Sequence, residues 1–186
     1  MKKLILLLSL VLISFQANAG ILIEPYYGMI NSGSVEGDGD FEEDYTGTEM
    51  GARLGWTSLG LQLGVDYRIH SIEFETRISG FDVDFDVEHT GMYAFIGYQF
   101  PVMFRLYGAY AISGNGGYTA TVNGAETEVD YEGFNSTILG ASYTGLPFVA
   151  INFEVVNFEW DEDEDGNEES NEWSHYLLSV SIPISL

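Results

Sequence analysis

Residues 176–186 of this chain read YLLSVSIPISL, and their alternation decides the fold. One register is wholly apolar: Tyr176, Leu178, Val180, Ile182, Ile184 and Leu186. The other is mostly hydroxyl: Leu177, Ser179, Ser181, Pro183 and Ser185. A repeat of two residues predicts a β-strand whose two faces meet different surroundings. An apolar face opposite a small polar face is typical of a barrel wall with lipid outside and a wet lumen inside.

Other segments of the chain alternate in the same way, most clearly residues 48–57 and 61–70. The remaining segments are residues 21–30, 91–100, 104–112, 135–143 and 149–156. Each is about ten residues long, which is the length that a tilted strand needs to cross a bilayer. The sequence therefore predicts an all-β fold, an eight-stranded antiparallel up-and-down transmembrane β-barrel.

The predicted connections between these strands alternate in length. The short ones are residues 57–60, 101–103 and 144–147, and the long ones are residues 31–47, 71–90, 113–134 and 157–174. Short turns on one rim and long loops on the other are typical of outer-membrane barrels, so we expect both chain ends on the periplasmic rim. Asn123-Gly124 is a hairpin signal, and it predicts a raised β-hairpin whose edges could pair with another protein.

The acidic residues follow the same division. Of the 29 acidic residues, all fall in the long connections except Glu24, Glu49, Asp66 and Glu154, which lie on the small polar face. No charge falls on the apolar face, where an arginine or lysine at mid-bilayer would cost about 2–4 kcal/mol. This distribution predicts acidic extracellular loops above a membrane wall.

The charge and cysteine content exclude other classes of protein. A net charge of −23 at pH 7 argues against nucleic-acid binding, which needs basic patches. The aromatic content of 15% argues against disorder. The chain has no cysteine, so an exported form would depend on a closed barrel rather than on disulfides. The alternative is a secreted soluble barrel or sandwich, but the polar face of such a protein usually carries many Lys and Glu rather than Gly and Ser.

The beginning of the chain predicts export. Lys2 and Lys3 precede an apolar run at residues 4–15, and Ala17-Asn18-Ala19 fits the small-residue cleavage pattern. We expect residues 1–19 to be a cleaved signal peptide and residues 20–186 to be the barrel.

Over residues 20–186, the chain resembles the small eight-stranded outer-membrane barrels of the OmpA and OmpX type. The resemblance rests on the export signal, the alternating segments, the rhythm of short and long connections and the terminal strand. It implies a monomer among outer-membrane lipids and lipopolysaccharide in a Gram-negative bacterium, inserted by the assembly machinery that reads the last strand. Family members commonly end in Phe, whereas this chain ends in Leu186 after Pro183, which removes a hydrogen-bond donor from a paired strand.

An ion network is expected inside the barrel. An eight-stranded lumen is just wide enough to be filled by side chains, and buried charges must be paired. The inward register holds residues of both signs: Glu24, Glu49, Arg53, Asp66, Arg68, Arg105 and Glu154. We expect them to plug the lumen, and the alternative is a narrow cation-selective pore.

The last long connection matches a calcium-loop spacing, in which alternate carboxylates converge on one hard cation. Its candidate ligands are Asp161, Asp163, Asp165, Glu169 and Glu172. Because the match lies inside an acidic run, it predicts either a hydrated acidic loop or a loose site for calcium or another divalent cation; no other cofactor is expected.

Three histidines, His70, His89 and His175, fall near the outer rim, and His70 and His175 are in the inward register. Lipid-modifying barrel enzymes place a His, a Ser and an acid at a lipid-facing site, but no His-x-Ser pair occurs here. We therefore predict no catalytic residues and a non-enzymatic structural or surface-interaction role. The alternatives are the small cation pore and a lipid A-modifying enzyme.

Overall fold

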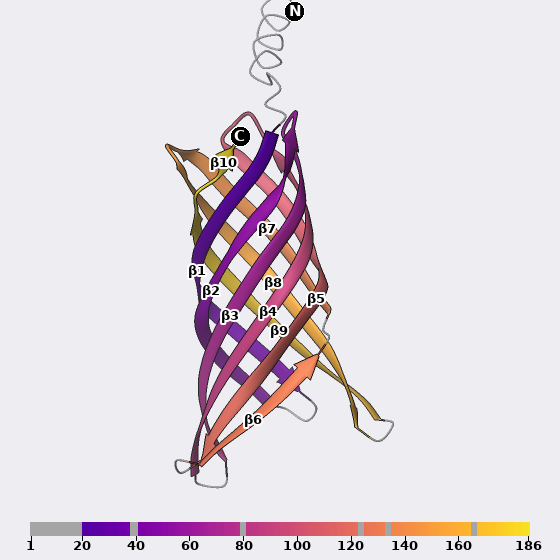
Figure 1. The fold of residues 1–186 in the computed structure, drawn as a ribbon. Helices are drawn as coiled ribbons and strands as arrows, with labels where there is room; N and C mark the ends of the chain where they lie inside the picture. Colours follow the sequence, from indigo (N-terminus) through magenta and orange to yellow (C-terminus); the bar gives the residue numbers. More distant parts are fainter. Residues whose placement is uncertain (1–19, 38–40, 79–80, 123–124, 133–134, 165–166) are drawn as a thin grey trace, which may run out of the picture.

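The computed structural model describes residues 20–37, 41–78, 81–122, 125–132, 135–164 and 167–186. The predicted signal peptide, residues 1–19, lies outside the described residues. The chain forms one antiparallel sheet that closes into a cylinder, with the strands tilted against its axis (Figure 1). Its strands are β1 (Gly20–Gly37), β2 (Phe41–Ser58), β3 (Leu61–Ile78), β4 (Phe81–Gln99), β5 (Phe104–Val122), β6 (Ala125–Glu132), β7 (Asn135–Leu146), β8 (Val149–Glu164), β9 (Asn167–Ser181) and β10 (Ile184–Ser185).

These strands fill eight positions in the wall, which confirms the predicted up-and-down barrel. Neighbours in sequence pair with each other, and β1 closes the cylinder against β9 and β10. β6 and β7 occupy one position, because both pair with β5, β6 along Asn115–Val122 and β7 along Phe104–Tyr110. β9 and β10 occupy another, interrupted at Ile182 and Pro183. No helix in the described part of the chain is long and apolar enough to cross a membrane.

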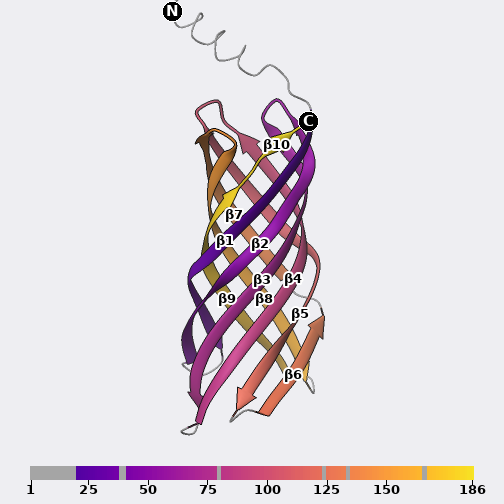
Figure 2. The ribbon, with the colours of Figure 1, turned by 60° about the vertical axis from the view of Figure 1, so that its left-hand side comes forward.

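The interruption lies where two prolines face the closing seam. Pro183 has no N–H to donate, and Pro25 on β1 lies opposite the break. One backbone hydrogen bond still crosses the seam here, from Ile182 N to Pro25 O at 3.0 Å. Beyond the break, Ile21 and Leu186 exchange both backbone hydrogen bonds at 3.0 Å, so the first and last strands meet at the same rim. We call this end the terminal rim, and the opposite end the distal end (Figure 2).

Short turns join the strands at the terminal rim. Leu59 and Gly60 both have positive φ, 51° and 84°, as a two-residue hairpin turn between twisted strands requires. Met103 and Phe148, in the other two turns, also have positive φ. The three short connections expected from the sequence are therefore at one rim.

The expected loop boundaries were wrong at the distal end. Most of residues 31–47, 71–90, 113–134 and 157–174 continues the strands, so β1 to β5 each have 18 or 19 residues. At about 3.3 Å per residue and a tilt near 40°, such strands rise roughly 45 Å, against an apolar band of about 25 Å. Beyond the apolar belt the strands stay paired, but their outward side chains can be acidic instead of apolar. The sequence there lacks the alternation of apolar and hydroxyl residues, so it does not reveal the strands.

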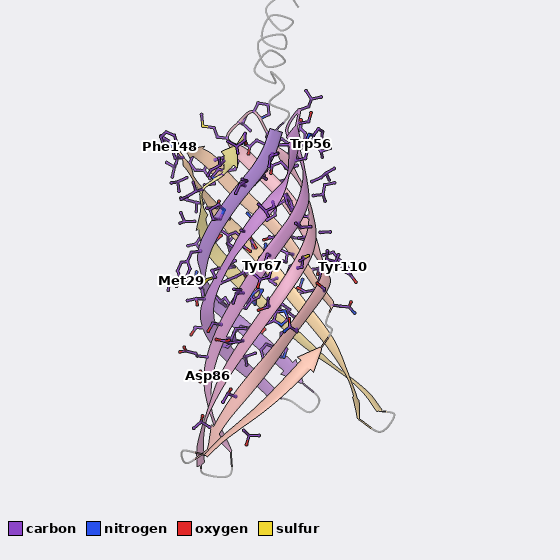
Figure 3. All side chains as sticks on the ribbon, viewed as in Figure 1. Met29, Trp56, Tyr67, Asp86, Tyr110 and Phe148 are labelled. Atoms are coloured by element: carbon purple, nitrogen blue, oxygen red, sulfur yellow. The ribbon has the colours of Figure 1, made fainter. Side chains whose placement is uncertain are left out.

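The outer surface is divided accordingly. Large apolar side chains are exposed around the half nearer the terminal rim, including Leu54, Phe104 and Phe153, each about half exposed. Figure 3 shows Trp56 and Phe148 near that rim, Met29, Tyr67 and Tyr110 about halfway along, and Asp86 toward the distal end. Barrels that span a membrane present such an apolar belt to the bilayer.

Inside the barrel, two tyrosine rings each lie over the glycine that is paired with the tyrosine on the neighbouring strand. Tyr26 is opposite Gly51, and Tyr107 is opposite Gly140. A Cβ at Gly51 would come within 2.5 Å of the Tyr26 ring, and one at Gly140 within 2.3 Å of the Tyr107 ring. The absent side chains leave room for these rings to lie flat in the lumen, where they cover the arginines.

Candidate functional site

The structure brings the seven charged residues of the lumen together. Each is at most 2% exposed, and they come from five different strands. They are Glu24 on β1, Glu49 and Arg53 on β2, Asp66 and Arg68 on β3, Arg105 on β5 and Glu154 on β8. Strand alternation turns all of them inward, because their sequence neighbours carry the apolar outer face. We call this set the lumen network.

Arg105 occupies the part of the network nearest the terminal rim. Both of its terminal nitrogens donate to Glu24, Nη2 to Oε1 at 2.5 Å and Nη1 to Oε2. Nη2 also donates to Ser142 Oγ at 3.0 Å and to Asn152 Oδ1 at 3.2 Å, and Ser181 Oγ donates to Glu24 Oε1 at 2.6 Å. The bidentate ion pair between Arg105 and Glu24, with its hydroxyl and amide partners, spans the lumen.

Arg53 and Arg68 share the middle of the lumen. Arg53 donates to Glu24 at 3.3 Å, to Asp66 at 3.1 Å and to Glu154. Its guanidinium lies between the rings of Tyr26 and Tyr107, 4.6 and 4.5 Å from their centroids. A cation stacked on aromatic faces gains further electrostatic stabilisation in a dry site.

Arg68 joins three carboxylates. Its nitrogens lie 2.6 Å from Glu49 Oε1, Asp66 Oδ2 and Glu154 Oε2. Burying these charges is costly, and the close pairing offsets that cost. What the network can do chemically is tie opposite walls together and fill the lumen with fixed side chains.

The three histidines all lie inside the barrel, at the distal end of the lumen network. His70 and His175 are at most 1% exposed, and His89 is 5% exposed. His70 is paired directly with Glu49 on one side and with His89 on the other. His175 reaches the same level from β9, with its ring centroid 5.9 Å from that of His70. None of the three therefore faces the lipid.

Sequence reasoning identified these histidines but not their convergence with Glu49. A signal was present, because the turn at Leu59–Gly60 fixes the register of β2 and β3 and thereby places Glu49 opposite His70. The position of His175 across the lumen needed the closure of the barrel.

A groove of about 480 Å³ lies on the distal part of β3, β4 and β5. Glu73, Asp86 and Glu88 line it, and all three are exposed on the outer face, whereas their neighbours Ile72 and Val87 are buried. The other lining residues are small or uncharged: Ser71, Thr90, Asn115, Gly116, Gly117 and Thr119. Glu73 is paired directly with Asp86, so two negative charges are adjacent across the strands. Because like charges lie side by side in this acidic groove, it attracts positively charged groups.

The predicted calcium ligands fall on the hairpin between β8 and β9. Asp161 and Asp163 are in β8, Glu169 and Glu172 are in β9, and Asp165 lies outside the described residues. The backbone pairs Asp163 with Glu168 and Glu159 with Glu172. This part of the expected loop is thus strand, and calcium binding stays a prediction.

Comparisons with solved structures show the fold class that this architecture defines. The chain is similar to Neisserial surface protein A, with 13% identity, a TM-score of 0.60, and coverage of 88% of this chain and 97% of that one. It is also similar to Ail, the attachment invasion locus protein of Yersinia pestis, with 14% identity, a TM-score of 0.61, and coverage of 89% and 99%. OprG of Pseudomonas aeruginosa is similar with 11% identity, a TM-score of 0.55, and coverage of 90% and 97%.

These likenesses show that the fold is that of the small eight-stranded outer-membrane β-barrels. No protein-family model matches the sequence, and no curated protein matches it either.

Proposed function

We propose that this protein is a non-enzymatic integral protein of a Gram-negative outer membrane that binds positively charged partners at the cell surface. The observation that carries the proposal is the acidic groove on the distal sheet. The terminal rim would face the periplasm, as the short turns suggest, and the distal strands would then stand outside the cell among lipopolysaccharide. Insertion would use the assembly machinery and the last strand, and the barrel would act as a monomer.

The distal sheet is suited to surface contact because it is not closed. β6 pairs with β5 alone among the described strands, so its other edge has no partner strand there. β3 to β6 thus form a four-stranded sheet at the distal end (Figure 1). The groove lies on the outer face of this sheet. Acidic side chains along such a sheet resist pairing between copies of the protein while leaving it available to a basic partner.

A solved structure provides a contrast. Ail has been crystallised in complex with the heparin analogue sucrose octasulfate. A polysulfated ligand is repelled by a surface with Glu73, Asp86 and Glu88, so the partner class here is expected to be cationic. Basic peptide segments and polyamines carry the required charge.

Neither alternative function gains comparable support. A cation pore needs a water path, whereas the arginines and tyrosines of the lumen network are tightly packed between the strands. A lipid A-modifying enzyme needs its catalytic group at the lipid, whereas the three histidines lie inside the lumen.

The proposal is tested by measuring binding of a fluorescent lysine-rich peptide to the barrel in lipid nanodiscs. We expect saturable binding that weakens at high salt and at least tenfold weaker binding by a Glu73→Gln, Asp86→Asn, Glu88→Gln variant. The matched control removes the same number of charges from the β8–β9 hairpin, by Asp161→Asn, Asp163→Asn and Glu168→Gln. Equal losses in the two variants, or preferential binding of sucrose octasulfate, would show that the groove is not the site.

A further inference from the structure

A second candidate site lies inside the barrel, at the distal end of the lumen network. Glu49, His70 and His175 each offer one metal-ligating atom there, and these atoms all lie within 4.8 Å of one another. All three side chains are at most 1% exposed. We propose that these three residues bind a single divalent transition-metal ion, which ties β2 and β3 to β9 across the lumen.

Each residue of this triad has a buried donor atom that makes no hydrogen bond. Glu49 Oε1 accepts a hydrogen bond from Arg68, whereas Oε2 makes none and faces His70 Nδ1 at 3.0 Å. Nε2 of His70 and Nε2 of His175 also make no hydrogen bond. Buried polar atoms are nearly always paired, so unpaired donor atoms on three residues whose ligand atoms lie within 4.8 Å of one another indicate a ligand between them.

Tyr45 orients His175 as a supporting residue of a metal site does. Its hydroxyl lies 3.0 Å from His175 Nδ1 and donates a hydrogen bond to the carbonyl oxygen of Ser174 at 3.4 Å. When its proton is directed to Ser174, the Tyr45 oxygen can accept a hydrogen bond from His175 Nδ1–H. That tautomer would leave His175 Nε2 unprotonated and able to bind a metal, as in most metal-bound imidazoles.

The charges of the lumen favour a cation at this position. Among the described residues, the buried ionisable groups of the lumen network are three arginines and four carboxylates, so one negative charge is left uncompensated when the histidines are neutral. Glu49 is the carboxylate beside the histidines, and it contacts a single arginine. A buried charge without a counter-ion is strongly unfavourable, and a bound divalent cation supplies one.

The donor set selects the class of metal. Two imidazoles and a carboxylate suit zinc, cobalt, nickel or copper, whereas calcium and magnesium require oxygen ligands. Tetrahedral zinc, with bonds of about 2.0–2.2 Å, leaves a fourth position for a small molecule. Two residues further toward the distal end of each strand, a buried apolar layer is formed by Ile72, Val87 and Trp173. Because this layer covers the site, the ion is expected to enter most readily while the barrel folds.

The experiment compares barrels refolded into lipid vesicles with a chelator or with zinc, followed by removal of loose metal. We expect one zinc ion per barrel and a higher thermal midpoint than in the metal-free protein. Cobalt in place of zinc should give the visible absorption of a site with low coordination number and nitrogen ligands. Failure of the wild-type barrel to retain zinc, or an octahedral cobalt spectrum typical of surface carboxylates, would overturn the proposal.

Variants then assign the ligands. His175→Gln and Glu49→Gln should each bind zinc at least tenfold more weakly, and Tyr45→Phe about ten- to a hundredfold more weakly. The matched control is His89→Gln, which changes a histidine of the same layer outside the triad and should keep the wild-type affinity. A shift in gel mobility on boiling shows that each variant is folded. An equal loss of zinc affinity in His89→Gln and His175→Gln would overturn the three-residue assignment. If His175→Gln does not fold, the Tyr45→Phe affinity and the cobalt spectrum of the wild type test the proposal instead.

Discussion

Replacing Arg68 by methionine is expected to destabilise the barrel much more than replacing Glu49 by glutamine. Arg68 contacts three buried carboxylates at 2.6 Å, so its loss leaves Glu49, Asp66 and Glu154 each short of a partner. Breaking a buried ion pair from one side costs about 3–5 kcal/mol, and here the surplus of negative charge also rises from one to two.

Glu49→Gln removes a single charged hydrogen bond, worth about 1.5–3 kcal/mol. The substitution also balances three arginines against three carboxylates, which offsets part of that loss. The two variants should therefore differ by about 2 kcal/mol in the free energy of unfolding, with Arg68→Met the less stable.

Urea unfolding in lipid vesicles, followed by tryptophan fluorescence and with a chelator present, measures the difference. The slope m should be unchanged, because both variants bury the same surface. Salt should have little effect on the difference, since the groups are shielded from solvent ions. Equal midpoints, or a difference that disappears in high salt, would refute the reasoning and show that the lumen is wet.

Three further predictions follow from the wall, the glycines and the acidic hairpin. Leu54→Arg, on the lipid-facing side of β2, should lower the free energy of unfolding in vesicles by about 2–4 kcal/mol, whereas Glu88→Arg in the distal sheet should change it little; equal effects would contradict the assigned membrane level. Gly140→Ala should push the Tyr107 ring off its position and cost about 1–3 kcal/mol in the same assay, with a neutral result showing that the lumen is loosely packed. Millimolar calcium should raise the thermal midpoint of the wild type but not of an Asp161→Asn, Asp163→Asn variant, and an unchanged wild type would end the calcium hypothesis.

Much of the barrel was predictable because the membrane imposes a local rule on every strand. A residue such as Leu54 or Phe153 must be apolar because it faces hydrocarbon, and its neighbours Arg53 and Glu154 can be charged because they face the lumen. That rule ends where the strands leave the bilayer. Beyond it, Glu73 and Asp86 were placed in a long connection although their backbones are paired. Raised hairpins were expected there, but the extent of the distal sheet and its groove were missed.

The sequence by itself determined the eight strands, the lipid-facing side of each and the seven charges turned inward, because alternation depends only on neighbouring residues and the solvent on either side. The pairing of Glu49 with His70 was not predicted, although it follows from the sequence once the two-residue turn at Leu59–Gly60 is known. Only the tertiary structure decided that Arg68 also reaches Glu154 and that His175 meets Glu49 and His70. Those contacts depend on the closure of the sheet between β1 and β9, and closure brings together residues whose separation along the chain carries no local signal.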